Sequence, residues 1–258
     1  MNANLIEIAY IVAASLFILG IKGLSKPKTA VRGNQLAAVG MLVAIVVTLL
    51  NSSVVSYEWI IAGALVGTLV GAVLAVKIQM TAMPQLIALL NGFGGGASLA
   101  VASAEFMKSQ SSPAGVLAQM TDLHVGGLST VAMIAIGAAV FIGAVTLTGS
   151  LVAFAKLQEL IGGQPKGFPG MKFLTALILI GSIIGIGYLT IDPTNTELFW
   201  GIVAAACVMG ILLVMPIGGA DMPVVIALLN SYSGIAAAAA GFVMGNNALI
   251  ITGSLVGA

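Results

Sequence analysis

Residues 172–191 read KFLTALILIGSIIGIGYLTI, and this stretch contains no charged side chain after Lys172. An α-helix rises about 1.5 Å per residue, so about 20 such residues cross the roughly 30 Å hydrocarbon core of a bilayer. The apolar residues are continuous and do not alternate with polar ones, which is not the pattern of a transmembrane β-strand. The stretch therefore predicts a membrane-spanning helix.

Composition extends this prediction to the whole chain. Of the 258 residues, 60% are hydrophobic, nine are Lys or Arg and eight are Asp or Glu, and the mean hydropathy is +1.17. So few charges cannot cover a water-soluble globule, which excludes a soluble enzyme. A net charge of +1 without a basic face excludes nucleic-acid binding. The single cysteine excludes disulfides within the chain and cysteine-based metal sites.

The sequence predicts an all-α polytopic membrane protein with nine transmembrane helices, the last of them cut short. We expect these helices at about residues 5–24, 35–54, 58–76, 83–106, 128–154, 172–191, 197–215, 222–244 and 247–258. The ninth stretch has only 12 residues, too few to cross a bilayer. We therefore expect residues 1–258 to form one transmembrane domain of a chain that continues beyond Ala258.

The positive charges predict the orientation of these helices, because cytoplasmic loops are enriched in Lys and Arg. Eight of the nine basic residues fall on one side of the membrane: Lys22, Lys26, Lys28, Arg32, Lys77, Lys156, Lys166 and Lys172. Lys108 alone falls on the other side. The sequence thus predicts an amino terminus outside and a carboxyl terminus in the cytoplasm.

One segment of the sequence occurs twice. Residues 83–91 read MPQLIALLN and residues 222–230 read MPVVIALLN, identical at seven of nine positions. The motif TGSLV likewise occurs at 148–152 and at 252–256. We interpret helices one to four as repeated in helices five to eight. Four is an even number, so both copies should cross the membrane in the same direction, and each Met-Pro helix should pack with the helix that follows it.

Three of the polar residues inside predicted spans are candidates for function, because such side chains are costly in a membrane and often functional. Asn91 and Asn230 each lie eight residues after the Met of the repeated segment, or roughly 12 Å into the membrane. Their carboxamides could order water in a shared polar path, or they could simply hydrogen bond neighbouring helices. Ser150 has the same two interpretations.

Two titratable residues are further candidates. Asp221 directly precedes Met222 and Pro223, so its carboxylate could cap a helix, lie at a cytoplasmic mouth, or do both. His124 is the one histidine, and an unperturbed histidine has a pKa near 6.5. The neighbours of His124 place it in an external loop or at the edge of a span, so an ordinary interfacial histidine is the favoured interpretation.

Four segments of the sequence are distinctive: GGADMPVV at 218–225, LNSYSG at 229–234 with the alanines to 240, TGSLVAFAK at 148–156, and the segment at 83–91. Together they resemble the β subunit of proton-translocating NAD(P) transhydrogenase. The resemblance implies a nine-helix membrane domain, a cytoplasmic NADP(H)-binding domain absent from this chain, and a dimeric complex in the bacterial inner membrane. It also implies an α subunit that brings an NAD(H)-binding domain and extra membrane helices. We expect no cofactor or metal site in this chain itself.

By the same resemblance, Asn91, Ser150 and Asn230 belong to a proton path, with Asp221 at its cytoplasmic mouth under the NADP(H) domain. One departure matters, because some family members have a histidine where this chain has Asn91, and His124 lies elsewhere. Either the partner subunit supplies the titrating group, or protons pass through waters that amides order. Of the two asparagines Asn230 is the stronger candidate, since its helix carries the longest family-like motif.

We therefore expect the membrane part of an enzyme that couples hydride transfer between NADH and NADP⁺ to proton movement into the cytoplasm. The chain has no βαβ pattern and no soluble segment long enough for a nucleotide fold. A proton- or cation-coupled secondary carrier is the alternative, since same-direction repeats occur in carriers, although nearly all loops are too short for a substrate gate. A purely structural membrane subunit is the third possibility.

Overall fold

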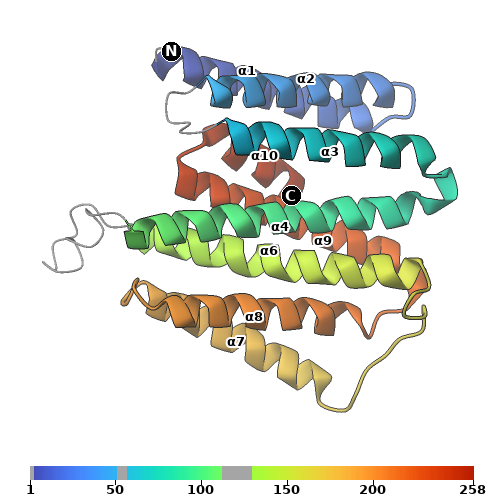
Figure 1. Cartoon of the computed structure of the whole chain (residues 1–258). Helices are drawn as coiled ribbons and strands as arrows, with labels where there is room; N and C mark the ends of the chain where they lie inside the picture. Colours follow the sequence, from blue (N-terminus) through green and yellow to red (C-terminus); the bar gives the residue numbers. More distant parts are fainter. Residues whose placement is uncertain (1–2, 51–56, 112–129) are drawn as a thin grey trace, which may run out of the picture. The chain divides into compact units, whose positions relative to one another are not determined.

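The computed structural model of the chain describes residues 3–50, 57–111 and 130–258, and all regular structure in these ranges is helical. The α-helices are α1 (Ala3–Leu24), α2 (Ala30–Leu49), α3 (Glu58–Lys77), α4 (Met83–Ser111), α6 (Thr130–Leu157), α7 (Met171–Leu189), α8 (Thr196–Val214), α9 (Met222–Met244) and α10 (Asn247–Gly257), shown in Figure 1. Two short 3₁₀ turns, η1 (Met80–Ala82) and η2 (Gly219–Asp221), precede α4 and α9.

Eight of these nine helices are long and apolar enough to cross a membrane, namely α1 to α4 and α6 to α9. The ninth, α10, is apolar but has 11 residues. The prediction of an all-α polytopic membrane protein is thus confirmed for the ranges that the structure describes.

Helix ends differ from the prediction where a helix carries polar residues in its last or first turns. α2 begins at Ala30 rather than near residue 35, and it includes Arg32 and Asn34. α6 continues to Leu157 and includes Lys156, which the charge pattern alone places in the following connection. Hydropathy marks the part of a helix that lies in lipid, whereas the backbone hydrogen bonds of the helix continue beyond it.

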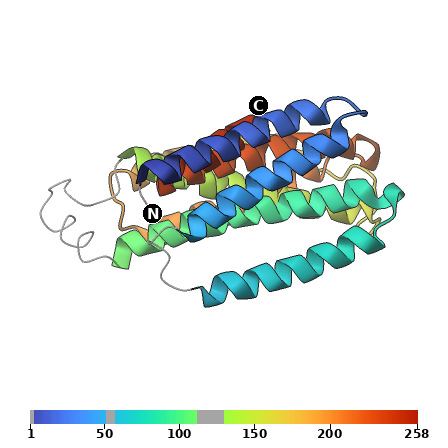
Figure 2. The ribbon, with the colours of Figure 1, turned by 90° about the horizontal axis from the view of Figure 1, so that it is seen from above.

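The chain forms two compact units, residues 1–80 and residues 81–258. In the first unit α1 and α2 form a hairpin, and they lie side by side in both views (Figures 1 and 2). A hydrogen bond of 3.0 Å joins Tyr10 Oη and Thr48 Oγ1 across this hairpin. None of the residues of α3 is buried.

In the second unit α6 is the central helix and packs against α4, α8 and α9. The core contains a stacked aromatic pair, Phe106 of α4 and Phe199 of α8, with 4.0 Å between the ring centroids. A separate cluster of buried apolar residues includes Ala88 of α4, Ala153 of α6 and Leu229 of α9. The arrangement places α4, α6 and α9 in mutual contact.

Facing glycines allow three pairs of helices to approach closely. The pairs are Gly20 with Gly33 between α1 and α2, Gly95 with Gly143 between α4 and α6, and Gly234 with Gly253 between α9 and α10. A Cβ added to Gly95 would lie 2.8 Å from the carbonyl oxygen of Gly143, which is closer than packed atoms approach. Small residues at such contacts are typical of membrane helices. The predicted packing of each Met-Pro helix with the next described helix is thus confirmed.

Many large apolar side chains lie on the outside of the helices. Trp59 of α3, Phe173 of α7 and Ile184 of α7 are examples of exposed apolar side chains. A soluble protein cannot expose contiguous apolar faces of this kind, whereas lipid solvates them without cost. The outer surface therefore supports a bilayer as the surrounding solvent.

The two copies of the Met-Pro segment begin helices in the same way. α4 begins at Met83 directly after η1, and α9 begins at Met222 directly after η2. Gln85 Nε2 donates to the carbonyl oxygen of Leu157, and Lys156 Nζ donates to that of Ile217, so both helices begin at the end of the unit where α6 finishes. α4 and α9 therefore run in the same direction, while the four-helix repeat as a whole stays a prediction.

Candidate functional site

Asn91 lies in the third turn of α4 and faces α9. Its side chain is only 7% exposed. Its Nδ2 donates to the carbonyl oxygen of Ile226 at 3.5 Å, and its Oδ1 accepts a hydrogen bond from Ser233 Oγ at 2.9 Å. The carboxamide therefore bridges two turns of α9, with both of its polar atoms in hydrogen bonds.

Ser150 lies on the face of α6 that contacts the same part of α4. Its side chain is fully buried, and its hydroxyl has no hydrogen-bond partner among the described residues. A Cβ on Gly92, the residue after Asn91, would lie 3.1 Å from Ser150 Cβ. The glycine thus lets α4 and α6 approach at this point.

Thr146 lies one turn before Ser150 on the same helix and has the same environment. It is fully buried, and no described residue hydrogen bonds with its hydroxyl. A Cβ on Gly95 would lie 2.8 Å from Thr146 Cβ. Buried hydroxyl groups nearly always have a partner, often an ordered water, so two unpartnered hydroxyls on one face of α6 require a physical explanation.

Asn230 lies apart from this cluster. Its side chain is exposed and forms no hydrogen bond with the described parts of the chain. Its carbonyl oxygen accepts a hydrogen bond of 2.8 Å from Ser233 Oγ. Because Asn91 hydrogen bonds with Ile226 and Ser233 of α9, which lie on either side of Asn230 in the sequence, the two asparagines lie at a similar level. The residue of α9 that hydrogen bonds Asn91 Oδ1 is Ser233 and not Asn230.

Asp221 is the last residue of η2 and directly precedes α9. It is exposed, and its carboxylate makes no capping hydrogen bond to the first turn of α9. It has no ion-pair partner in the ranges that the structure covers. The helix-cap interpretation is therefore not supported by the geometry, and the carboxylate is free at the end of the unit where α6 finishes.

Lys156 lies near the end of α6, yet its side chain is only 1% exposed. Its ammonium donates to the carbonyl oxygens of Val214 at 3.4 Å and Ile217 at 2.7 Å, and also to that of Met215. These carbonyls belong to the last residue of α8 and to the connection after it. The last carbonyl groups of a helix have no N–H donor within the helix. A cation at this place also interacts favourably with the helix dipole.

The connection after α8, whose carbonyls accept hydrogen bonds from Lys156, leads directly to Asp221. The backbone N–H of Lys166 donates to Met215 O at 3.0 Å, and that of Gly219 donates to Gly163 O at 2.8 Å. These bonds join the connection after α6 to the connection before α9. These backbone hydrogen bonds fix the position of Asp221, and the buried ammonium of Lys156 stabilises the connection that makes them.

Three of these residues were not among the candidates from the sequence. Ser233 lies three residues after Asn230, which is neighbour spacing on a helix face, and Thr146 lies four residues before Ser150. Spacing from a known candidate could therefore have found both. Lys156 follows an apolar segment, and a lysine at such a position is expected to extend toward the membrane surface. The sequence therefore does not predict that Lys156 is buried.

The chemistry of this cluster is limited to hydrogen bonding. Amides and hydroxyls cannot take or release a proton at neutral pH, but they can order water. Among the described residues, no three His, Cys, Asp or Glu side chains gather as a metal site would require. His124 lies outside the described residues. The fold and the cluster together define a polytopic membrane protein with a buried polar site between α4, α6 and α9.

The chain belongs to the NAD(P) transhydrogenase beta subunit family, which matches residues 6–258. It is 42% identical over 257 residues to the NAD(P) transhydrogenase subunit beta of Rhodospirillum rubrum, and a second Rhodospirillum rubrum sequence of that name gives the same identity. These matches cover 100% of this chain and 53% of each relative. The chain therefore spans about half the length of these relatives, and the predicted family is confirmed.

Proposed function

We propose that this chain is the membrane part of a proton-translocating transhydrogenase of the bacterial inner membrane. Hydride transfer between NADH and NADP⁺ would take place on soluble domains of the complex and would be coupled to proton movement into the cytoplasm. An α subunit would supply the NAD(H)-binding domain and further membrane helices. The NADP(H)-binding domain would be the other part of the β subunit, and the complex would be a homodimer.

The described residues fit a membrane role and do not fit a nucleotide site. They contain no β-strand, so no βαβ unit for a dinucleotide lies among them. Both nucleotides would thus bind to other domains of the complex. What this chain contributes is the part of the protein through which the proton crosses.

The polar cluster of the buried side chains of Asn91, Thr146 and Ser150 with the half-buried Ser233 is the observation that carries this proposal. None of these side chains can hold a charge at neutral pH, so a proton would cross on water that they order. Water bound beside α6 would give the hydroxyls of Thr146 and Ser150 the partner that the described residues do not provide. Asn230 lies three residues before Ser233, so the two are neighbours on the surface of α9. Its exposed side chain would extend the water path to the outside of that helix.

Asp221 would connect the path to the soluble domains. The excess of Lys and Arg on its side of the membrane supports a cytoplasmic location, and its carboxylate is exposed. A group that binds a proton differently in two nucleotide states must also shift nucleotide affinity by the same free energy, because coupling is reciprocal. Asp221 would supply part of this coupling.

A proton- or cation-coupled carrier is the second candidate. The observation that favours it is the common direction of α4 and α9, because parallel repeats also build carriers. A carrier would move protons when its solute is added and would need no nucleotide.

The two functions can be separated with the complete complex in sealed vesicles that contain a pH-sensitive dye. We expect proton movement only when NADH and NADP⁺ are both present, and we expect an uncoupler to abolish it. A stable complex that catalyses hydride transfer without moving protons would overturn the proposal. Proton movement on addition of a solute, without nucleotide, would favour the carrier.

A further inference from the structure

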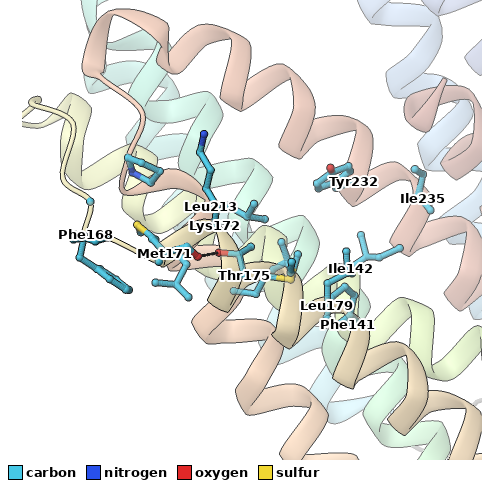
Figure 3. Close-up of a pocket in the computed structure, with 18 residues that line it drawn as sticks. Phe141, Ile142, Phe168, Met171, Lys172, Thr175, Leu179, Leu213, Tyr232 and Ile235 are labelled. Carbon is cyan, nitrogen blue, oxygen red and sulfur yellow. Dashed lines mark hydrogen bonds between the residues drawn. The ribbon is translucent and has the colours of Figure 1, made fainter.

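A large cavity lies in the second unit, apart from the polar cluster. It has a volume of about 890 Å³ and lies between α7, the connection before it, and the facing sides of α6, α8 and α9. Figure 3 shows Phe168, Met171 and Lys172 toward one end of this cavity, and Phe141 and Leu179 toward the other. Lys172 and Leu179 are seven residues apart on α7, so the cavity follows the helix for roughly 10 Å.

The two ends of the cavity differ in polarity. Of the residues that line it, only Lys172, Thr175 and Tyr232 have polar side chains. Thr175 Oγ1 donates to the carbonyl oxygen of Met171 at 2.9 Å, so its hydroxyl is already used. Lys172 is exposed and has no ion-pair partner within the described ranges. The cavity therefore has a free cation at the start of α7, the edge of the membrane span, and walls farther along the helix that are apolar apart from Tyr232.

We propose that this cavity binds one acyl chain of an anionic phospholipid, with the lipid phosphate at Lys172. An acyl chain matches the apolar walls, and a phosphate matches a lysine at the membrane edge, in the order in which a phospholipid presents the two. Basic pockets between membrane helices on the cytoplasmic side are typical binding places for anionic headgroups. A neutral lipid or an apolar helix of another subunit would leave the ammonium without a counter-ion.

A bound lipid would fill the space between α7 and α9. Tyr232 and Ile235 of α9 line the cavity, and α7 has its main contacts with α8 rather than with α9. The lipid would thus hold α7 against the helix that carries Ser233 and Asn230. This inference does not depend on the proton path, because lipid retention can be measured without any assay of activity.

Native mass spectrometry of the complete complex in mild detergent tests the proposal. Phosphatidylglycerol and phosphatidylcholine are titrated separately, and the fraction of complex that retains each lipid is measured. We expect tighter retention of phosphatidylglycerol, weakened about fivefold by Lys172→Gln, which corresponds to one lysine near a membrane surface. Ala176→Trp, which puts a ring into the cavity, should reduce retention of both lipids.

Two matched variants control these changes. Lys28→Gln removes an exposed lysine that does not line the cavity, and Leu177→Trp adds a ring on a part of α7 that does not line it. Both should retain lipid as the wild type does. Equal retention of phosphatidylglycerol by the wild type, Lys172→Gln and Ala176→Trp would overturn the proposal, as would a cryo-EM map of the complex with a protein segment in the cavity.

Discussion

At the residue scale, Asn91 is a polar side chain within a membrane helix, where polar side chains are costly and often functional. Its carboxamide is buried, and both of its polar atoms hydrogen bond with α9. A hydrogen bond between membrane helices contributes about 0.6 kcal/mol on average, so stability alone is a weak reason for an asparagine here. Its position beside two unpartnered hydroxyls on α6 favours a role in ordering water.

Asp221 should affect coupling more than folding. Asp221→Asn removes the negative charge but keeps the size and polarity of the side chain, and the native carboxylate makes no capping hydrogen bond that could be lost. We expect a stably assembled complex with an unchanged melting temperature and a reduced ratio of protons moved to hydride transferred. Both quantities are measured in vesicles of the complete complex. Normal coupling in the variant would remove Asp221 from the mechanism.

Replacing Lys156 should lower the stability of the fold at the end of the unit where α6 finishes. Lys156→Met keeps the length of the side chain but leaves the carbonyl of Ile217 without its donor. The carbonyls of Val214 and Met215 each lose one of two donors and keep a backbone N–H. A buried acceptor without a partner costs about 1–3 kcal/mol, so we expect a lower melting temperature of the purified complex. Lys28→Met, at an exposed position, should leave it unchanged. Equal melting temperatures for the two variants would contradict the role of Lys156.

At the element scale, the glycine pairs determine how closely the helices pack. Gly95 faces Gly143 across the contact of α4 and α6, whereas an added Cβ on its neighbour Gly94 would meet no atom within 4 Å. Gly92 allows the same approach beside Ser150. The glycine-rich run at residues 92–96 thus leaves one side of α4 without bulky side chains. It does not interrupt the helix, which continues from Met83 to Ser111.

Gly95→Val should therefore destabilise the complex far more than Gly94→Val. Both changes place the same β-branched side chain in the same helix, so the difference between them reports only the contact with α6. Overpacking of a tight contact costs about 1–3 kcal/mol, which thermal unfolding of the purified complex can resolve. If the two variants unfold at the same temperature, the close contact of α4 and α6 is not present in the complex.

Helices were predictable because their signal is local, whereas their contacts were not. A stretch such as 172–191 is apolar along its whole length, so it indicates a span but not which side faces a neighbour. The contact between Asn91 and Ser233 depends on the rotation of α4 and α9, which packing sets. Sequence therefore identified Asn91 and Ser150 as candidates, but it did not identify Ser233, which is the residue of α9 that hydrogen bonds Asn91 Oδ1.

On the scale of the whole molecule, the orientation in the membrane is the main untested prediction. Cys207 is replaced by Ala, and single cysteines are introduced by Lys166→Cys and Ile191→Cys on the connections at opposite ends of α7. We expect a membrane-impermeant maleimide to label the cysteine at position 191 in intact cells and the one at 166 only after permeabilisation. The reverse pattern would contradict the orientation and place Asp221 outside.

The central claim is that protons cross this chain at the cluster of Asn91, Thr146, Ser150 and Ser233. The most direct test is the rate of nucleotide-driven proton pumping by a complex with Asn91→Leu in sealed vesicles, with the melting temperature of the same preparation. Ser182→Ala, which removes another buried and unpartnered hydroxyl on α7, is the control. We predict that Asn91→Leu loses most of its pumping while the complex stays assembled and Ser182→Ala pumps normally. A stable Asn91→Leu complex that pumps at the wild-type rate would contradict the account.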